Sequence, residues 1–195
     1  MRDLRRSDRL AFVASPERRL VLLRHAKSAW PDGVPDHDRP LAPRGRRDAP
    51  AAGRWLRKSG LVPDRVMCST AQRARETWQL AEEKLGAHPQ AVFEQRVYGA
   101  TSAELLDLAR HAPAGVRTLL IVGHDPAMQE LTLDLASAQP GDQGLEAVSR
   151  VRVKFPTAAI AVLAFTGTWP KIAVGQACLT DFVTPGDFRS GRGEG

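Results

Sequence analysis

The sequence contains few of the residues that mark disulfide-rich or membrane proteins. Only Cys68 and Cys178 occur among its 195 residues. Two cysteines cannot build a disulfide framework, and such sparing use is typical of a reducing cytoplasm. Every apolar run falls short of the roughly 18 to 20 residues that a membrane-spanning helix requires. The basic start "MRDLRRSDRL" precedes an apolar patch too short for a secretory signal. These absences predict a soluble cytoplasmic protein that has no membrane partner.

The chain is basic, with 28 Lys and Arg against 22 Asp and Glu. Half of its net charge of +6 lies in residues 1–19, which carry six arginines and three acidic side chains. An aromatic platform for single strands, zinc-ligand spacing and a continuous basic helix are all missing from the sequence. We therefore expect no nucleic acid partner.

Apolar segments of strand length alternate with helical patterns along the chain. Strands are predicted at "RLVLL", "RVMCS", "AVFEQ" and "RTLLIV", and a final pair at "TAAIAVLAF" and "KIAVGQACL" around the turn "TGTWP". Helix starts are predicted at Ser69 with Gln72, at "TSAE", and at Asp125 followed by Pro126. This alternation predicts an α/β fold, a three-layer α/β/α sandwich whose central sheet is mostly parallel and whose final strand pair is antiparallel.

We expect a single domain, because neither an internal repeat nor a linker divides the chain. The domain is predicted at residues 19–184. Residues 1–18 are predicted to be a basic, flexible extension, and the polar, Gly-rich residues 185–195 a flexible tail.

Charged and polar side chains follow three of the predicted strands directly. Arg24 and His25 follow the first strand, Arg73 lies shortly after the second, and His124 follows the "TLLIV" strand. The carboxyl ends of parallel strands meet at one edge of a sheet, so we expect these four side chains to lie together. Arg73 falls in the first turn of its helix, where a cation is unfavourable unless an anion binds beside it. The sequence therefore predicts an anion site.

Four ordered segments, "LRHAKSAW", "DRPLAPRGRRDA", "CSTAQRARET" and "IVGHDPAM", resemble the signatures of the histidine phosphatase superfamily, which has the phosphoglycerate mutase-like fold. The similarity runs from about Leu20 to Val183 and is greatest to the SixA-type phosphohistidine phosphatases. It implies that His25 is the nucleophile, that Arg24 and Arg73 bind phosphate, and that His124 is the second catalytic histidine. Ala26 stands where the family's Arg-His-Gly motif usually has glycine.

Phosphoryl transfer needs these residue types, because its catalysis is mostly positioning and charge stabilisation. Arg24 and Arg73 can bind the equatorial oxygens, and a protonated His124 can donate a third hydrogen bond. His25 must be neutral to attack phosphorus. The guanidinium groups already neutralise the phosphate, so we expect neither a metal nor another cofactor. Lys27 and Ser28 lie close enough in sequence to contact the substrate.

Many members of the superfamily also carry a glutamate acid before the third helix, but "FEQRVYGATSAEL" gives no convincing match. Glu94, Tyr98 and Asp125 are available, and none is assigned as the acid. A pocket without an acid favours phosphohistidine, whose leaving group departs readily, over alkyl phosphates. The predicted function is therefore a metal-independent phosphatase acting on protein phosphohistidine, with inorganic phosphate as product.

Other interpretations remain open. The enzyme could hydrolyse small phosphate monoesters such as sugar phosphates or nucleotides, or the chain could be a phosphoprotein-binding module with negligible turnover. A mutase is disfavoured by the short chain. Taken singly, His25 and His124 could be structural, and Arg73 could pair with Glu76. We expect the Cys68 thiol to be buried and inert. Asp38, Arg39 and Gly45 are expected to shape the loop, with Arg39 paired to a carboxylate. The side chains of His37, His88 and His111 are expected to be exposed.

Overall fold

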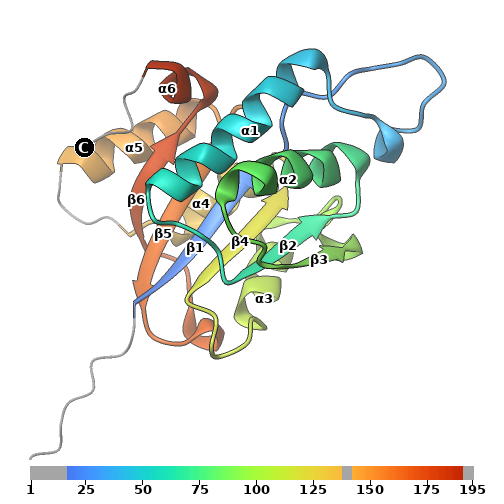
Figure 1. Cartoon of the computed structure of the whole chain (residues 1–195). Coiled ribbons are helices and arrows are strands. Elements are labelled where there is room, and N and C mark those ends of the chain that lie inside the picture. The colour runs from blue at the N-terminus through green and yellow to red at the C-terminus, as the bar shows by residue number, and fades with distance from the viewer. Residues whose placement is uncertain (1–16, 138–141, 191–195) are drawn as a thin grey trace, which may run out of the picture.

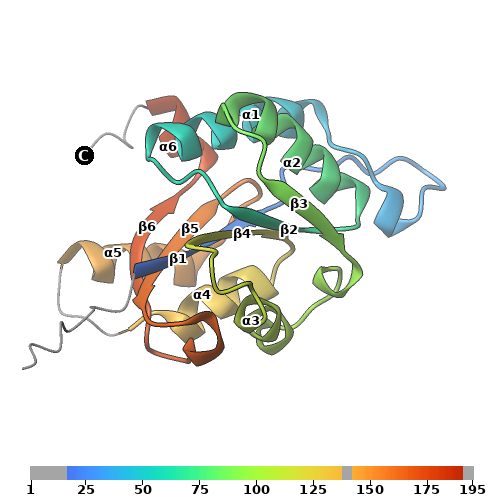
Figure 2. The same ribbon diagram turned by 60° about the horizontal axis from the view of Figure 1, so that its bottom comes forward.

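A six-stranded sheet forms the centre of the protein (Figure 1). The computed structural model describes residues 17–137 and 142–190. The sheet order is β3-β2-β4-β1-β5-β6. The strands are β1 (Glu17–Arg24), β2 (Arg65–Ser69), β3 (Gln90–Glu94), β4 (Thr118–Gly123), β5 (Ile160–Thr166) and β6 (Cys178–Val183). Helices cover both faces of this sheet (Figure 2), so the predicted α/β/α class is confirmed.

Strands β1 to β4 are parallel to one another, and β5 runs against both of its neighbours, β1 and β6. The predicted antiparallel pair at the end of the chain is therefore confirmed. Its second strand begins later than predicted, at Cys178. The reason is Trp169, whose buried indole N–H donates to the Val116 carbonyl at 2.8 Å. This contact holds Trp169–Lys171 in a short 3-10 helix, η3, before β6 can start.

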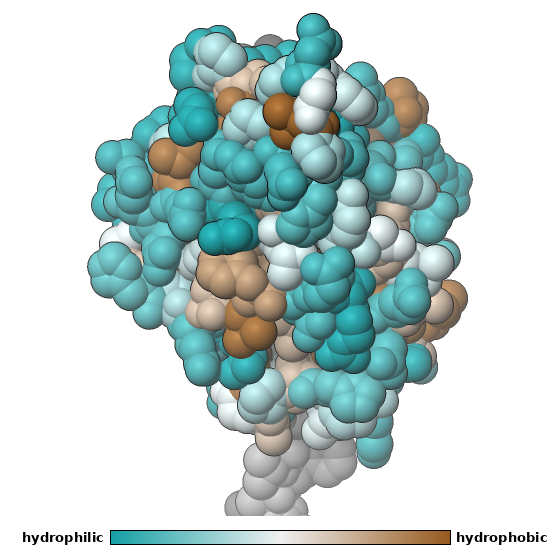
Figure 3. Space-filling view, turned by 90° about the vertical axis from the view of Figure 1, so that its right-hand side faces the viewer, coloured by the Kyte–Doolittle hydropathy of each residue, from teal (hydrophilic) through white to brown (hydrophobic). Residues whose placement is uncertain are grey.

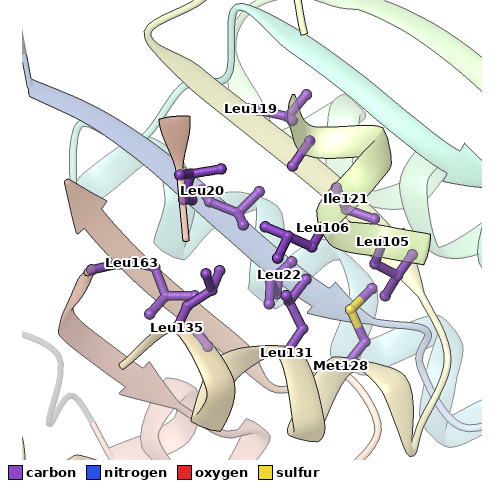
Figure 4. Packing of buried hydrophobic residues seen from close by; sticks show 14 of the residues in the cluster. Leu20, Leu22, Leu105, Leu106, Leu119, Ile121, Met128, Leu131, Leu135 and Leu163 are labelled. Atoms are coloured by element: carbon purple, nitrogen blue, oxygen red, sulfur yellow. The ribbon is translucent and has the colours of Figure 1, made fainter. Parts of the chain in front are cut away.

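The helices are α1 (Pro43–Lys58), α2 (Gln72–Leu85), α3 (Ser102–Arg110), α4 (Ala127–Leu135), α5 (Asp142–Val153) and α6 (Pro185–Ser190), with 3-10 turns η1 (Asp36–Asp38) and η2 (Gln95–Val97). Side chains on α1, α2 and α6 pack on one face of the sheet, and those on α3, α4 and α5 pack on the other. Figure 4 shows Leu131 and Leu135 of α4 directed at Leu20 and Leu22 of β1. Residues 20–23 of β1 are fully buried, as the apolar run predicted.

Helices α1 and α2 approach closely because α1 has a glycine at their contact. A Cβ atom at Gly53 would lie 2.0 Å from the main-chain oxygen of Ala81. Only a residue without a side chain fits this position, so Gly53 sets the distance between the two helices.

Of the three predicted helix caps, the one at "TSAE" forms at the predicted position. The Thr101 hydroxyl accepts from the Glu104 N–H at 3.3 Å, and the Glu104 carboxylate accepts from the Thr101 N–H at 2.8 Å. The prediction for Ser69 was wrong, because α2 begins later, after Ala71. Helix α4 also begins later than predicted, after Pro126, but the Asp125 carboxylate still accepts from the main chain of Gln129 in its first turn. The side chains of Ser69 and Asp125 both contact residues of the candidate site.

The ordered elements extend past both predicted domain boundaries. Strand β1 begins at Glu17, and helix α6 covers Pro185–Ser190 at the start of the segment predicted to be a tail. The half-buried Phe188 of α6 packs against the core cluster of α1 and α2. Residues 1–16 and 191–195 of the predicted extension and tail lie outside the described residues. Among the described helices, none has the length and apolar character to cross a membrane.

Candidate active site

The structure brings the four predicted site residues together at one edge of the sheet. Arg24 ends β1 and His25 follows it, His124 follows β4, and Arg73 lies in the first turn of α2 after β2. Because β4 lies between β1 and β2, the three segments are neighbours in space. The imidazole centroids of His25 and His124 are 5.0 Å apart. Both guanidinium groups lie near enough to lower the pKa of both histidines.

His25 is buried and held in one tautomer. Its Nδ1 lies 2.7 Å from the Ala26 carbonyl oxygen. A carbonyl only accepts, so Nδ1 carries the hydrogen and Nε2 keeps its lone pair in the neutral ring. Burial is the largest cause that lowers the pKa of His25 to about 3; the nearby His124, Arg73 and Arg24 also lower it, and the bond to Ala26 opposes the change. At neutral pH the ring is therefore uncharged.

His124 is also neutral in this pocket. Burial, and after it the charge of Arg73, lower its pKa to about 4. The expected protonation of His124 concerns the complex with a phosphoryl group and stays a prediction. Its Nε2 lies 2.8 Å from the hydroxyl of the fully buried Ser69, which also accepts from the Ala71 N–H at 3.2 Å. Ser69, predicted as a helix cap, therefore orients His124 instead.

Arg24 is anchored on the side of the pocket formed by the residues after α5 and β4. Its Nη1 donates to the Phe155 carbonyl at 2.5 Å and lies 3.3 Å from Asp125 Oδ2. Burial raises the pKa of the Asp125 carboxyl, and the attraction to Arg24 opposes this rise. Asp125 is thus a partner of Arg24.

Arg73 is bound by Asp36 of the loop between β1 and α1. Its Nη2 donates to Asp36 Oδ2 at 2.9 Å, and its Nη1 donates to the Asp36 carbonyl at 2.5 Å. Arg73 is only 6% exposed, whereas the side chain of Asp36 is 50% exposed. The alternative pairing of Arg73 with Glu76 does not form, because Glu76 binds Arg46 at 3.1 Å.

Asp36 is the centre of a hydrogen-bonded cluster. Besides Arg73, its carboxylate accepts from Arg39 Nη1 at 2.7 Å and from the Tyr98 hydroxyl at 2.9 Å. The bonds from Arg39, Tyr98 and Arg73 hold the pKa of Asp36 well below its usual range. The hydrogen bond between Tyr98 and Asp36 also raises the pKa of the Tyr98 hydroxyl. The Tyr98 ring stands edge-on to His124 at 5.5 Å. The cluster therefore forms one wall of the pocket.

The predicted contacts Lys27 and Ser28 lie in the loop directly after His25. Lys27 is exposed, while Ser28 is buried and its hydroxyl accepts from Arg39 Nη2 at 2.7 Å. A Cβ at Gly45 would lie 2.2 Å from the Lys27 carbonyl oxygen, so a glycine lets the first turn of α1 pack on this loop. The prediction that Arg39 pairs with a carboxylate is confirmed by its bond to Asp36.

Sequence reasoning missed Asp36 and His37 as site neighbours, and it considered Tyr98 only as an available acid. The His37 ring contacts Tyr98 at 4.9 Å, and its side chain is 36% exposed, less than predicted. The side chains of His88 and His111 are 89% and 73% exposed, as predicted. Asp36 and His37 contact Arg73 and Tyr98, which are distant in sequence. The signal available in the sequence was their position just before Arg39 in "DHDRPL".

Two further predicted residues can be placed. The Glu94 carboxylate accepts from the Arg96 side chain at 3.1 Å, which contributes to lowering its pKa. Cys68 is fully buried, and burial raises the pKa of its thiol. The expectation of a buried thiol is confirmed, and no thiolate is available there at neutral pH.

Comparison with known proteins agrees with this fold. A model of the histidine phosphatase superfamily (branch 1) matches residues 20–97, which include Arg24, His25 and Arg73. Two solved structures assigned to the SixA phosphohistidine phosphatases align with this chain over nearly all of their own length. The chain belongs to the histidine phosphatase superfamily and is of the SixA type.

The protein from Nakamurella multipartitia is 35% identical with a TM-score of 0.77, and the match covers 88% of this chain and 98% of that one. The protein from Agrobacterium tumefaciens is 30% identical with a TM-score of 0.71, covering 86% and 98%. An uncharacterized protein of Mycobacterium tuberculosis is 45% identical over 163 residues, which cover 84% of this chain and 99% of the relative. The family supports phosphatase activity.

Proposed function

We propose that this chain hydrolyses phosphohistidine on proteins through a covalent intermediate on His25. One observation carries the proposal: two arginines and two neutral histidines converge at the sheet edge, while Asp36 and Glu94 nearby are each bound by arginines. The SixA-type relatives support the same substrate class.

In the first step, the lone pair on His25 Nε2 attacks phosphorus. A new P–N bond forms, the bond from phosphorus to the substrate's imidazole nitrogen breaks, and that nitrogen keeps the electron pair and takes a proton. Arg24 and Arg73 bind the equatorial oxygens as charge spreads over them. With Ser69 donating its hydroxyl hydrogen to His124 Nε2, the Nδ1–H of His124 is left to donate to a third oxygen.

In the second step, water attacks the phosphorus of phospho-His25. The P–N bond breaks, the pair returns to Nε2, and inorganic phosphate leaves. The proton that the attacking water gives up passes to the solvent and replaces the one that the substrate nitrogen took from the solvent in the first step. A phosphoryl dianion between the Arg24 and Arg73 guanidinium groups offsets their repulsion of a protonated His124 ring. Substrate binding therefore raises the pKa of His124 and strengthens its hydrogen bond to the phosphoryl oxygen. Lys27 is the exposed cation beside this pocket and remains a predicted substrate contact.

The choice of leaving group follows from the lack of a free acid. A positioned general acid typically supplies about 10² to 10⁴-fold. Asp36 is held as a carboxylate, Glu94 is bound by Arg96, and the Tyr98 hydroxyl hydrogen is directed at Asp36. Imidazole departs with far less help than an alkoxide, so this pocket favours phosphohistidine and phosphoramidate over alkyl phosphates.

Hydrolysis of small alkyl monoesters is the second candidate, and one observation favours it. Burial raises the pKa of the Asp125 carboxyl, as a proton donor requires, although its bond from the Gln129 main chain and the charge of Arg24 oppose this rise. Its bond to Arg24 argues for the anionic form.

The ratio of kcat/KM for a phosphohistidine protein to that for a sugar phosphate tests the proposal. We expect a ratio of about 10² or more, the size of a missing acid. A ratio near one, together with a loss of alkyl ester hydrolysis in Asp125→Asn, establishes the second candidate instead. Asp181→Asn is the control for Asp125→Asn, because Asp181 lies on β6 away from the pocket.

A further inference from the structure

Trp30 is an exposed indole that the fold of the domain does not explain. Its side chain lies in the loop after His25, and 73% of its surface is exposed. The guanidinium carbon of Arg39 lies 3.1 Å from the ring centroid, so one face of the indole is stacked and the other faces solvent. Tryptophan is among the residues most enriched at the energetic centres of protein interfaces.

The stacked guanidinium is fixed in place. Arg39 is only 6% exposed. Its Nε donates to the Ala29 carbonyl at 3.0 Å, and its two other nitrogens donate to Ser28 and Asp36, each at 2.7 Å. A ring stacked on an immobilised cation loses little conformational freedom when a partner covers its open face. Trp30 is therefore organised for contact in advance.

The same contacts connect Trp30 to the anion site. Arg39 stacks on the indole and binds Asp36 Oδ1, while Asp36 Oδ2 accepts from Arg73. Figure 1 shows the segment between β1 and α1 projecting beyond the sheet at this end. The face seen in Figure 3 is mainly hydrophilic, with separate small hydrophobic patches. An indole held here can be reached by a molecule whose phosphoryl group is in the pocket.

The charges near Trp30 indicate what kind of molecule this is. Lys27 is exposed, and α1, whose first turn contains no acidic residue, begins beside it through the Ala42 N–H bond to the Lys27 carbonyl at 2.9 Å. The side chains of Arg44 and Arg46 in that turn are each 54% exposed, and they pair with Asp48 and Glu76 respectively. The loop itself carries the exposed carboxylates of Asp32 and Asp38. Charges of both signs therefore surround Trp30, and a complementary partner places an apolar side chain on the ring within a polar, charged surface.

We propose that Trp30 is the docking contact for the phosphorylated protein substrate, and that it binds an apolar side chain on the substrate surface beside the phosphohistidine. This inference rests on the proposed function. A free sugar phosphate or phosphoramidate fills only the anion pocket, whereas a protein surface extends over the loop. Trp30 thus contributes to the KM of protein substrates and leaves that of small substrates unchanged.

The test compares kcat/KM of wild type, Trp30→Ala and Trp30→Phe on a phosphohistidine protein and on phosphoramidate. Phe93→Ala is the matched control, because Phe93 is 44% exposed and has Arg75 over its ring at 5.4 Å, but lies on β3. We expect Trp30→Ala to lower kcat/KM for the protein by about 10-fold or more through KM, as hot-spot residues do. Phosphoramidate turnover stays within about 2-fold, Trp30→Phe is intermediate, and Phe93→Ala resembles wild type, as near-neutral surface changes do.

Several outcomes overturn the inference. If Trp30→Ala lowers kcat/KM equally on both substrates, Trp30 supports the structure of the pocket and is not a docking contact. If it lowers kcat/KM on neither substrate, Trp30 has no role in docking. The proposed function survives both results. If wild type does not hydrolyse the phosphohistidine protein, the proposed function fails and the docking proposal fails with it. Binding of a single-stranded oligonucleotide that Trp30→Ala abolishes, without an effect on protein turnover, assigns the ring to a different partner.

Discussion

Asp36 takes two hydrogen bonds from Arg73, one on its carboxylate at 2.9 Å and one on its main-chain carbonyl at 2.5 Å. The carboxylate therefore orients the Arg73 guanidinium group. At the same time, its negative charge offsets the positive charge of Arg73, which would otherwise attract a phosphoryl group more strongly. Orientation and charge can be separated in part by substitution, because an amide loses the charge but keeps one of the two accepting oxygens, which can still face Arg73.

Asp36→Asn is expected to bind inorganic phosphate more tightly, by about 3- to 10-fold, with kcat little changed. The removed charge is worth about 1 kcal/mol for a group this exposed. Isothermal titration with phosphate and steady-state kinetics measure the two quantities. Asp36→Ala loses orientation as well, so kcat should fall by about 10-fold or more while phosphate binding stays tight. Weaker phosphate binding in Asp36→Asn contradicts this account of the charge.

His25→Gln should abolish turnover and leave the fold intact, since the side chain lies in a loop after β1 and adds little to the core. Circular dichroism checks the fold. Alkaline quench of wild type during turnover should trap labelled phosphate on His25, whereas acid quench should release it. Label on Ser28 or Cys68 instead is incompatible with the proposed nucleophile.

Arg73→Ala should lower kcat by about 10² to 10³-fold, as does removal of other preorganised donors to developing charge. Arg73→Lys should recover only part of the loss, because an ammonium cannot reproduce the planar fork. Vanadate or sulfate should inhibit wild type competitively, and activity should persist in EDTA. Unchanged turnover by Arg73→Ala, or its loss in wild type on chelation, shows that the pocket is assigned wrongly.

Acid should destabilise the protein through its two buried histidines. Their folded pKa values are about 3 for His25 and about 4 for His124, below the ordinary value of 6.5. The unfolded chain therefore binds more protons below pH 6.5, and the free energy of unfolding falls as pH falls from 6.5 toward 4. Each histidine contributes about 1.4 kcal/mol per pH unit in this window. Urea unfolding at several pH values should show a smaller slope for His25→Gln and an unchanged slope for His88→Gln.

Gly53→Ala should destabilise the fold although alanine is the better helix former. The added Cβ meets the Ala81 carbonyl oxygen at 2.0 Å, and overpacking of this kind costs about 1 to 3 kcal/mol. Gly144 of α5 has open space around it, so Gly144→Ala should stabilise by up to about 1 kcal/mol. Thermal or urea unfolding compares the two. Equal effects at both positions contradict the close contact of α1 and α2.

The sequence predicts those parts of the site that depend on strand order. Arg24, His25 and His124 directly follow apolar strands, so periodicity and the rules for α/β sheets place them at one edge. The partner of Arg73 follows no such rule. Asp36 reaches it across 37 residues from an irregular loop whose path no periodic pattern describes. The expected cap at Ser69 was wrong for a related reason: its hydroxyl bonds to a distant histidine in preference to the local helix end.

The anion pocket takes its residues from segments that become neighbours only when β1, β2 and β4 have paired. Partly assembled chains lack it, so we expect phosphate to bind the complete sheet and not the unfolded ensemble. By mass action, phosphate at 100 times its dissociation constant adds about 2.7 kcal/mol to the stability of the folded state. The product of the reaction is thereby also a thermal stabiliser of the enzyme, and the melting temperature becomes a direct reading of how much phosphate surrounds it.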